Sequence, residues 1–284
     1  MPELPEVETV VRGLRRTVLG KTIAKVQSSA PPKSIQLSDR FGRTSFADTL
    51  RGRRIEHINR RGKNILMALS GDITLWVHLK MTGRFLFVER SYPVHKHDLV
   101  VIDFMRSRDN DNRFHLRFND YRRFGRLHLF SDDELWLQKG LASLGPEPLQ
   151  LSADEFVGMC RTRHRMIKSA LLDQTFLAGL GNIYADEVLF ASRIHPERIL
   201  SSISEKKLRE LHGHIQRLLK KAIRLMGTTV DSFAGLNGRT GRFQRYLLAY
   251  GREGAPCTRC GTKIIRKKIG SRSAHFCGRC QLRR

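Results

Sequence analysis

Two Cys-x-x-Cys pairs near the C-terminus, CTRC at residues 257–260 and CGRC at residues 277–280, bracket the sixteen residues GTKIIRKKIGSRSAHF at 261–276. Each pair can form a metal-binding knuckle, and four thiolates complete a closed tetrahedral zinc site without an open position for water. The spacing therefore predicts one structural zinc ion with four ligands: Cys257, Cys260, Cys277 and Cys280. The basic insert predicts a β-hairpin that suits DNA, and a protein-binding zinc ribbon is the alternative.

The charge of the chain indicates a polyanionic partner. The 284 residues contain 52 Lys and Arg against 27 Asp and Glu, a net charge of +25, and the basic residues are spread along the whole sequence. Phosphate backbones are the common polyanion, so a nucleic acid is expected, with a ribosomal or nucleic-acid-coating protein as the alternative. We expect no membrane span, no secretory signal and a reducing, cytoplasmic location.

Upstream of the cysteine module, apolar residues recur at helical spacing. This pattern predicts four helices, at Ala153–Cys160, Ile167–Asp173, Asn182–Ser192 and Glu205–Met226. The loop 177–182 contains two glycines and separates two of these helices, with Asn182 expected as an N-cap. A glycine-rich segment, 235–241, precedes the cysteine module.

The first half of the chain has a different pattern. Residues 3–19 predict an amphipathic helix that Gly20 ends. Short apolar runs then predict strands at Ile65–Leu69, Ile73–Leu79, Phe85–Val88, Leu99–Phe104, Phe114–Phe118 and Leu127–Phe130. We expect two packed antiparallel sheets. The predicted fold is α+β, with a β-sandwich domain (1–131), a linker containing a short helix (132–150), a helical domain (151–245) and a zinc module (246–284).

The N-terminus allows a second kind of chemistry. If Met1 is removed, Pro2 becomes a secondary amine, and an α-amino group titrates near ~7.7–8.0, so that a useful fraction is unprotonated at neutral pH. Such an amine can attack an aldehyde-level carbon and form an iminium ion, which permits elimination at adjacent carbons. Glu3 and Glu6 lie three residues apart near this amine, where one can donate a proton. The alternative is that Pro2 merely starts a helix.

Several motifs occur together in one order along the chain. They are Met1–Thr9 (MPELPEVET), Arg61–Asn64 (RGKN), His78–Gly83 (HLKMTG), Arg122–Gly125 (RRFG), Leu144–Pro148 (LGPEP), Gly179–Glu187 (GLGNIYADE), Tyr250–Arg252 (YGR) and the closing cysteines. This ordered set resembles formamidopyrimidine-DNA glycosylases over essentially the full length. The resemblance implies a β-sandwich with a catalytic N-terminal helix, followed by a helix-two-turn-helix domain and a zinc-finger hairpin.

The resemblance also implies roles for individual residues. Pro2 would be the Schiff-base nucleophile that attacks C1′ of the damaged nucleotide, and Glu3 the proton donor, with Glu6 in support. Lys63 would serve β-elimination and hold a phosphate. Arg272, at the hairpin, would serve δ-elimination and phosphate binding.

The remaining matches concern DNA binding. Met81, Arg122 and Phe124 match side chains that fill the gap left by a flipped nucleotide. His97, Arg163 and Asn182 match contacts to backbone phosphates. From the residues alone, Met81 ends a strand pattern and is a core residue, and His97 is a solvated surface histidine. Phe124 beside two arginines and a glycine instead fits an exposed wedge.

Two positions depart from the family pattern. Tyr121 replaces a proline or small apolar residue before the RRFG loop, and the loop 235–243 ends Gly241-Arg242-Phe243, where an aromatic residue is common at the arginine. Both concern lesion preference and leave the reaction class unchanged.

The resemblance implies a bifunctional DNA glycosylase/AP lyase of base excision repair, monomeric, acting on double-stranded DNA with oxidised bases or abasic sites. Oxidised purines such as 8-oxoguanine and formamidopyrimidines are the expected substrates. An endonuclease VIII-like preference for oxidised pyrimidines is the alternative, although that branch opens Pro-Glu-Gly-Pro-Glu and Leu4 favours the purine branch. A non-catalytic zinc-ribbon DNA-binding protein has no reason to combine Pro2, two nearby acids and the Arg-Gly-Lys loop.

Overall fold

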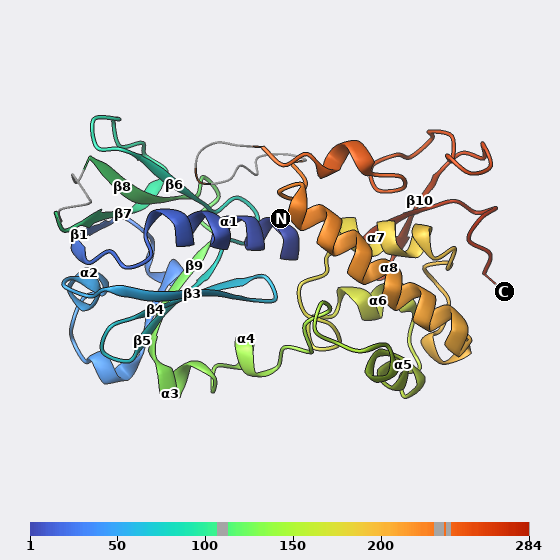
Figure 1. Ribbon diagram of the computed structural model, residues 1–284, viewed down its shortest axis with the longest axis horizontal. Coiled ribbons are helices and arrows are strands. Elements are labelled where there is room, and N and C mark those ends of the chain that lie inside the picture. Colours follow the sequence, from blue (N-terminus) through green and yellow to red (C-terminus); the bar gives the residue numbers. More distant parts are fainter. Residues whose placement is uncertain (107–112, 230–235, 237–239, 284) are drawn as a thin grey trace. The chain divides into compact units, whose positions relative to one another are not determined.

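The computed structural model in Figure 1 describes residues 1–106, 113–229, 236 and 240–283. It contains two compact units: Met1–Ala142 with Met226–Arg242, and Ser143–Leu225 with Phe243–Arg284. The predicted domain limits assign residues 226–242 to the helical part, whereas the described portion of this segment packs in the first unit. Leu236 belongs to the core of that unit.

Helix α1 (Leu4–Thr17) opens the first unit. Its apolar residues recur every three or four positions, so one face is buried in the core, and Val7, Val11 and Leu14 are fully buried. A reciprocal capping box between Glu3 and Glu6 satisfies backbone groups at its start. The helix is two residues shorter at its C-terminal end than predicted, and Gly20 turns the chain with φ +78° toward the first strand.

The core of the first unit lies between two sheets, as predicted. One sheet has the order β1-β7-β8-β6 and the other β2-β9-β5-β4-β3. Phe85 and Leu116 from the first sheet share one apolar cluster with Leu75 and Leu127 from the second. The strands are β1 (Ile23–Ser28), β2 (Ile35–Leu37), β3 (Ile55–Arg61), β4 (Asn64–Leu69), β5 (Ile73–His78), β6 (Arg84–Glu89), β7 (Asp98–Phe104), β8 (Phe114–Asn119) and β9 (Arg126–Ser131).

Three strands, helix α2 (Phe46–Leu50) and one linker helix went unpredicted. β1, β2 and β3 lie at sheet edges, and β3 buries mainly Ile55 and Ile58, so its sequence has too few apolar residues to be recognised. In the linker, the single expected helix is two short ones, α3 (Asp132–Leu135) and α4 (Lys139–Ala142). The unit also contains α2 (Phe46–Leu50) and 3-10 turns at Pro32–Ser34 and Asp39–Phe41.

The second unit contains the four predicted helices and the predicted hairpin. The helices are α5 (Ala153–Arg161), α6 (Ile167–Leu172), α7 (Asn182–Ala191) and α8 (Glu205–Arg224), with 3-10 turns at Leu200–Ser202 and Phe243–Tyr246. β10 (Ile265–Ile269) and β11 (Arg272–Phe276) form the antiparallel hairpin. None of the helices in the described residues is long and apolar enough to cross a bilayer.

The prediction that Asn182 caps α7 is wrong by one position. Gly181 is the N-cap, with extended φ −134°, and Asn182 is the first helical residue. Because the cap is a glycine, it offers no side-chain acceptor to the helix N-terminus, and the Asn182 side chain is not used as a cap.

Candidate active site and nucleic-acid interface

The first candidate group lies at the start of α1. Pro2, Glu3 and Glu6 are all buried, and Glu3 and Glu6 expose 3% and 2% of their surface. Glu6 Oε2 accepts the backbone N–H of Glu3 at 2.8 Å. Glu6 thus orients the backbone directly after Pro2, while the Glu3 side chain accepts the backbone N–H of Glu6 in the capping box.

The second oxygen of Glu6 reaches a distant part of the chain. Oε1 accepts the backbone N–H of Thr228 at 2.7 Å. Gly227 precedes it with φ +77°, and a Cβ there would lie 2.5 Å from Glu6 Oε1. The close approach therefore requires glycine, and Glu6 joins the N-terminus to the segment that returns to the first unit.

Lys63 lies in the tight turn between β3 and β4, where Arg61 pairs with Asn64. Gly62 adopts φ +57°, which suits a two-residue hairpin turn. The turn is tied to α1, because the Arg60 guanidinium binds Glu8 at 3.2 Å and the carbonyl of Gly62 at 3.0 Å. Lys63 is 6% exposed.

The surroundings of Lys63 are strongly basic. Burial, with Lys80 and Lys63 nearby, lowers the pKa of His78 to about 3. Burial and the charge of Arg126 lower the pKa of His128 to about 4. Both imidazoles are therefore neutral at physiological pH. The positive charge of this part of the first unit comes from Lys63, Lys80 and Arg126 and not from histidine.

The predicted wedge residues are brought together by one buried carboxylate, Asp120. Its Oδ2 accepts the N–H of Gly125 at 2.7 Å, and its Oδ1 accepts the N–H of Arg122 at 3.2 Å and the hydroxyl of Thr82. The loop after β5, which contains Met81, is thereby joined to the loop between β8 and β9.

The three wedge side chains are exposed on these two loops. Met81 and Phe124 expose 44% and 43% of their surface. The Arg122 guanidinium lies 4.8 Å from the centre of the Phe124 ring. Exposed apolar side chains beside an arginine are what insertion into a base stack requires.

His97 lies next to the same loops, because its carbonyl accepts the N–H of Asp120 at 2.9 Å. Its Nδ1 atom is buried without a hydrogen-bond partner among the described residues. The first unit therefore contains the predicted nucleophile Pro2, the two acids, Lys63, the three predicted wedge residues and one predicted phosphate contact.

The second unit supplies the other predicted phosphate contacts. Arg163 is exposed just after α5, between Arg161, which pairs with Glu205, and Arg165, which pairs with Asp173. Within the part of the chain that the structure describes, Arg163 has no acidic partner. It therefore remains available to a phosphate.

The turn before α7 is built by Gln174. Its Oε1 accepts the N–H of Gly179 at 2.9 Å, and its Nε2 donates to the carbonyl of Leu180 at 2.8 Å. Gly179 has φ +93°. This turn presents Asn182 and the first amide groups of α7, a favourable arrangement for an anion.

The four cysteines form the predicted metal site. Their Sγ atoms all lie within 4.8 Å of one another, with several separations of 3.5–3.9 Å. A tetrahedron with Zn–S bonds of about 2.3 Å has S···S edges of about 3.8 Å, so the donor set fits one zinc ion. The four thiolates leave no ligand position for water, and the role of zinc is structural. Arg272, exposed, starts β11 at the turn of the hairpin.

Models of three domains match this chain: the formamidopyrimidine-DNA glycosylase N-terminal domain at residues 1–127, the H2TH domain of the same enzymes at 144–234, and the zinc finger found in FPG and IleRS at 254–283. The chain belongs to the formamidopyrimidine-DNA glycosylase family. Relatives of that name from Heliobacterium modesticaldum and Pelotomaculum thermopropionicum are 44% and 43% identical, each over 99% of this chain and 100% and 99% of their own.

Solved structures of glycosylases in this family include complexes with DNA. A Lactococcus lactis FPG mutant with Fapy-dG-containing DNA has a TM-score of 0.88 and 35% identity, over 99% of this chain and 100% of that chain. The Lactococcus lactis protein with abasic-site DNA has the same TM-score and identity, over 99% of both chains. The family assignment makes this chain a DNA glycosylase of the DNA-repair class.

Several residues of the glycosylase site went unpredicted. Gly227 and Thr228 act through backbone groups, the Asp120 carboxylate accepts backbone N–H groups, and such single contacts to the backbone have no recognisable sequence signature. Of the two departures, Tyr121 is 55% exposed beside the wedge, and Phe243 is buried against Tyr184. Residues 235 and 237–239 of the second lie outside the described residues.

Proposed function

We propose that this chain is a bifunctional glycosylase/AP lyase that excises oxidised purines, such as 8-oxoguanine and formamidopyrimidines, from double-stranded DNA. The observation that supports this most strongly is the buried Pro2–Glu3 pair, oriented by Glu6, at the start of a helix in a chain that matches this family from end to end. We also propose that it acts as a monomer in the bacterial cytoplasm.

The first step joins the enzyme to the sugar. The Pro2 nitrogen, freed by removal of Met1, attacks C1′, and the bond from C1′ to the damaged base breaks. Glu3 donates a proton to the opening sugar or the departing base. The Pro2 nitrogen then loses its proton, and its lone pair forms an iminium with C1′ as the C1′–O4′ bond breaks and O4′ takes up a proton. This ring-opened iminium is the electron sink for elimination.

Strand cleavage follows from the acidity that the iminium gives to neighbouring carbons. Loss of a C2′ proton expels the 3′ phosphate oxygen in β-elimination, for which Lys63 holds the phosphate. Loss of a C4′ proton then expels the 5′ phosphate oxygen in δ-elimination, for which Arg272 holds the phosphate. Hydrolysis of the remaining iminium by water frees Pro2.

The direct test incubates the protein with duplexes containing 8-oxoguanine, a formamidopyrimidine or thymine glycol, followed by denaturing gels. We expect the purine lesions to be excised and the strand cut to products with phosphates at both ends. Preferential cutting at thymine glycol would instead support an endonuclease VIII-like enzyme, and binding without cutting would contradict the enzymatic proposal.

A further inference from the structure

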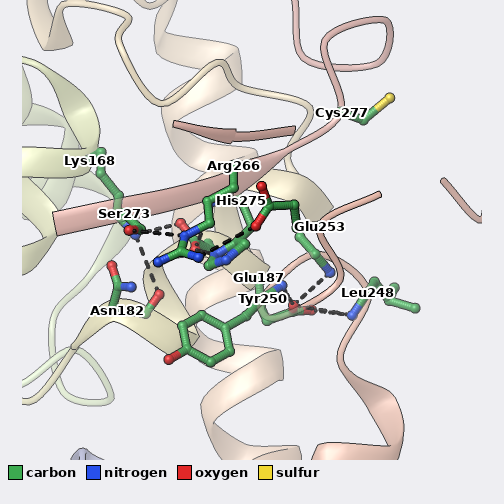
Figure 2. Close-up of polar contacts among 12 residues, drawn as sticks. Lys168, Asn182, Glu187, Leu248, Tyr250, Glu253, Arg266, Ser273, His275 and Cys277 are labelled. Carbon is green, nitrogen blue, oxygen red and sulfur yellow. Dashed lines mark hydrogen bonds and ion pairs between the residues drawn. The ribbon is translucent and has the colours of Figure 1, made fainter. Parts of the chain in front are cut away.

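Helix α7 contains two adjacent buried carboxylates that the proposed chemistry does not use, Asp186 and Glu187, each 2% exposed. Glu187 accepts the backbone N–H groups of Leu248, Ala249 and Tyr250, the last two at 2.8 Å, and so caps the turn that leads into the zinc module. Its burial raises its pKa. Asp186 instead contacts the hairpin at His275, a residue that is labelled in Figure 2.

Asp186 has three donors around it. Its Oδ1 forms an ion pair with Lys168, and the two side chains expose 1% and 0% of their surface. Its Oδ2 accepts the backbone N–H of His275 at 3.0 Å and the ring Nδ1–H at 2.9 Å. One carboxylate therefore binds both the main chain and the side chain of a single residue in β11, which fixes the direction of that strand.

The network also reaches the start of α7. Lys168 Nζ lies 3.4 Å from the carbonyl oxygen of Asn182. A Cβ on Gly270, at the hairpin turn, would lie 3.8 Å from the hydroxyl of Ser169, next to Lys168 in the chain. The ion pair thus lies between Asn182 and the hairpin. The hairpin residue that it contacts, His275, is three residues from Arg272 along β11.

The other ion pairs between the hairpin and the rest of the unit are more exposed. Arg266 pairs with Glu253 at 3.5 Å and Lys267 with Glu197 at 2.7 Å, and three of these four side chains are about half exposed. Exposed pairs contribute roughly 0–1 kcal/mol. The zinc ligands fix the knuckles at the base of the hairpin, and they do not determine how its far end lies against α6 and α7.

We propose that Lys168, Asp186 and His275 form a positioning network that holds the hairpin so that Arg272 and Asn182 meet the same stretch of DNA backbone. Asp186 acts through Arg272 and touches no reacting atom. A buried ion pair adds little net stability, because desolvation offsets the attraction between the two charges. Removing one partner leaves the other charge buried and unpaired, so the geometry of the pair is strongly determined. The inference rests on the phosphate-binding role proposed for Arg272.

The test is a double-mutant cycle on affinity for a duplex with a tetrahydrofuran abasic analogue, which needs no catalysis. Asp186→Asn keeps the size of the side chain and removes its charge. We expect about tenfold weaker binding, the lower end of what losing an orienting partner costs a binding group, with zinc content unchanged. Glu253→Gln, which removes an exposed hairpin contact, is the matched control and should bind normally.

The decisive comparison is with Arg272→Ala. If Asp186 acts by positioning Arg272, the double variant should bind within about twofold of Arg272→Ala alone, because the two losses are not independent. Additive losses, or normal binding by Asp186→Asn, would overturn the network while leaving the proposed function intact. Normal binding by Arg272→Ala would contradict the role proposed for Arg272 and the network with it.

A second variant covers the case in which Asp186→Asn does not fold. His275→Phe keeps the edge-to-face packing on Tyr250, whose ring centre lies 5.1 Å away, and removes only the ring hydrogen bond. It should retain zinc, weaken binding by a smaller factor and again be non-additive with Arg272→Ala. Additivity in this cycle would also overturn the proposal.

Discussion

At the scale of single residues, Glu3 and Glu6 belong to one motif and have different surroundings. Glu6 uses one oxygen for the backbone of Glu3 and the other for the backbone of Thr228. Its two backbone contacts suit an orienting role, and Glu3 is then the better candidate for the proton donor. The residues alone predicted both acids and left their roles open, because Thr228 lies 222 residues away, and the family resemblance named Glu3 as the donor with Glu6 in support.

Replacing Glu3 separates binding from chemistry. Glu3→Gln keeps the size of the side chain but cannot donate a proton, so we expect excision to fall by a factor of about 10² or more, the usual contribution of acid–base catalysis. Binding to lesion DNA should persist. Glu56→Gln, an exposed acid on β3, is the control, and wild-type excision by Glu3→Gln would contradict the proton-donor role.

The neutral histidines predict a pH dependence of stability. The pKa of His78 is lowered to about 3, so between pH 6.5 and 3 the unfolded chain binds a proton at this residue that the folded chain does not. The contribution of neutral His78 to the free energy of unfolding is complete above pH 6.5 and decreases as the pH falls. For this partly exposed residue we expect a loss on the order of 1 kcal/mol by pH 5.

Urea unfolding at pH 7.5 and 5 measures this effect. His78→Gln can still accept the Lys80 N–H and does not titrate, so its unfolding free energy should fall less between the two pH values. An identical fall in both proteins would show that His78 is not the titrating group.

At the scale of elements, the zinc module shows what patterns can and cannot predict. Spacing alone placed the four cysteines and the hairpin, because metal ligands impose distances along the chain. The docking of that module on α7 through Glu187 and Asp186 was not predicted, because adjacent acids on a helix usually indicate a solvated face. Edge strands such as β1 and β3 were missed for a similar reason, since few of their residues are apolar.

Removing a ligand tests the structural role of zinc. Cys257→Ser or Cys280→Ser should release the metal, disorder the knuckles and weaken DNA binding by at least tenfold, while the first unit, which has its own core, stays folded. Cys160→Ala is the matched control. Cys160 is buried outside the four-cysteine cluster, where burial raises its pKa to about 12, so zinc should remain. Normal binding and cutting by a zinc-free variant would contradict the hairpin's role.

At the scale of the whole molecule, the net charge of +25 predicted the class of partner and nothing about the site. The ordered motifs predicted the family and the candidate residues. The return of the described residues 226–229, 236 and 240–242 to the first unit was not predicted, because chain continuity favours assigning them to the preceding helix. Long-range contacts of this kind depend on the packed core, which local patterns do not encode.

The charge makes a measurable prediction for DNA affinity. With about five phosphates neutralised, log affinity should fall against log salt with a slope of about −4 to −5. Arg163→Ala should reduce the slope by about one, with similar losses on damaged and undamaged DNA. Arg161→Ala, whose guanidinium is already paired with Glu205, should change it less. A salt-independent affinity would contradict the phosphate contacts.

The central claim is that the Pro2 nitrogen forms the covalent intermediate, and borohydride trapping tests it most directly. Borohydride added during the reaction with 8-oxoguanine DNA should reduce the iminium and leave protein attached to DNA, visible as a shifted band. A protein that retains Met1 or carries an N-terminal extension has no free Pro2 amine and should give no such band. Trapping that survives a blocked N-terminus would contradict the assignment of Pro2.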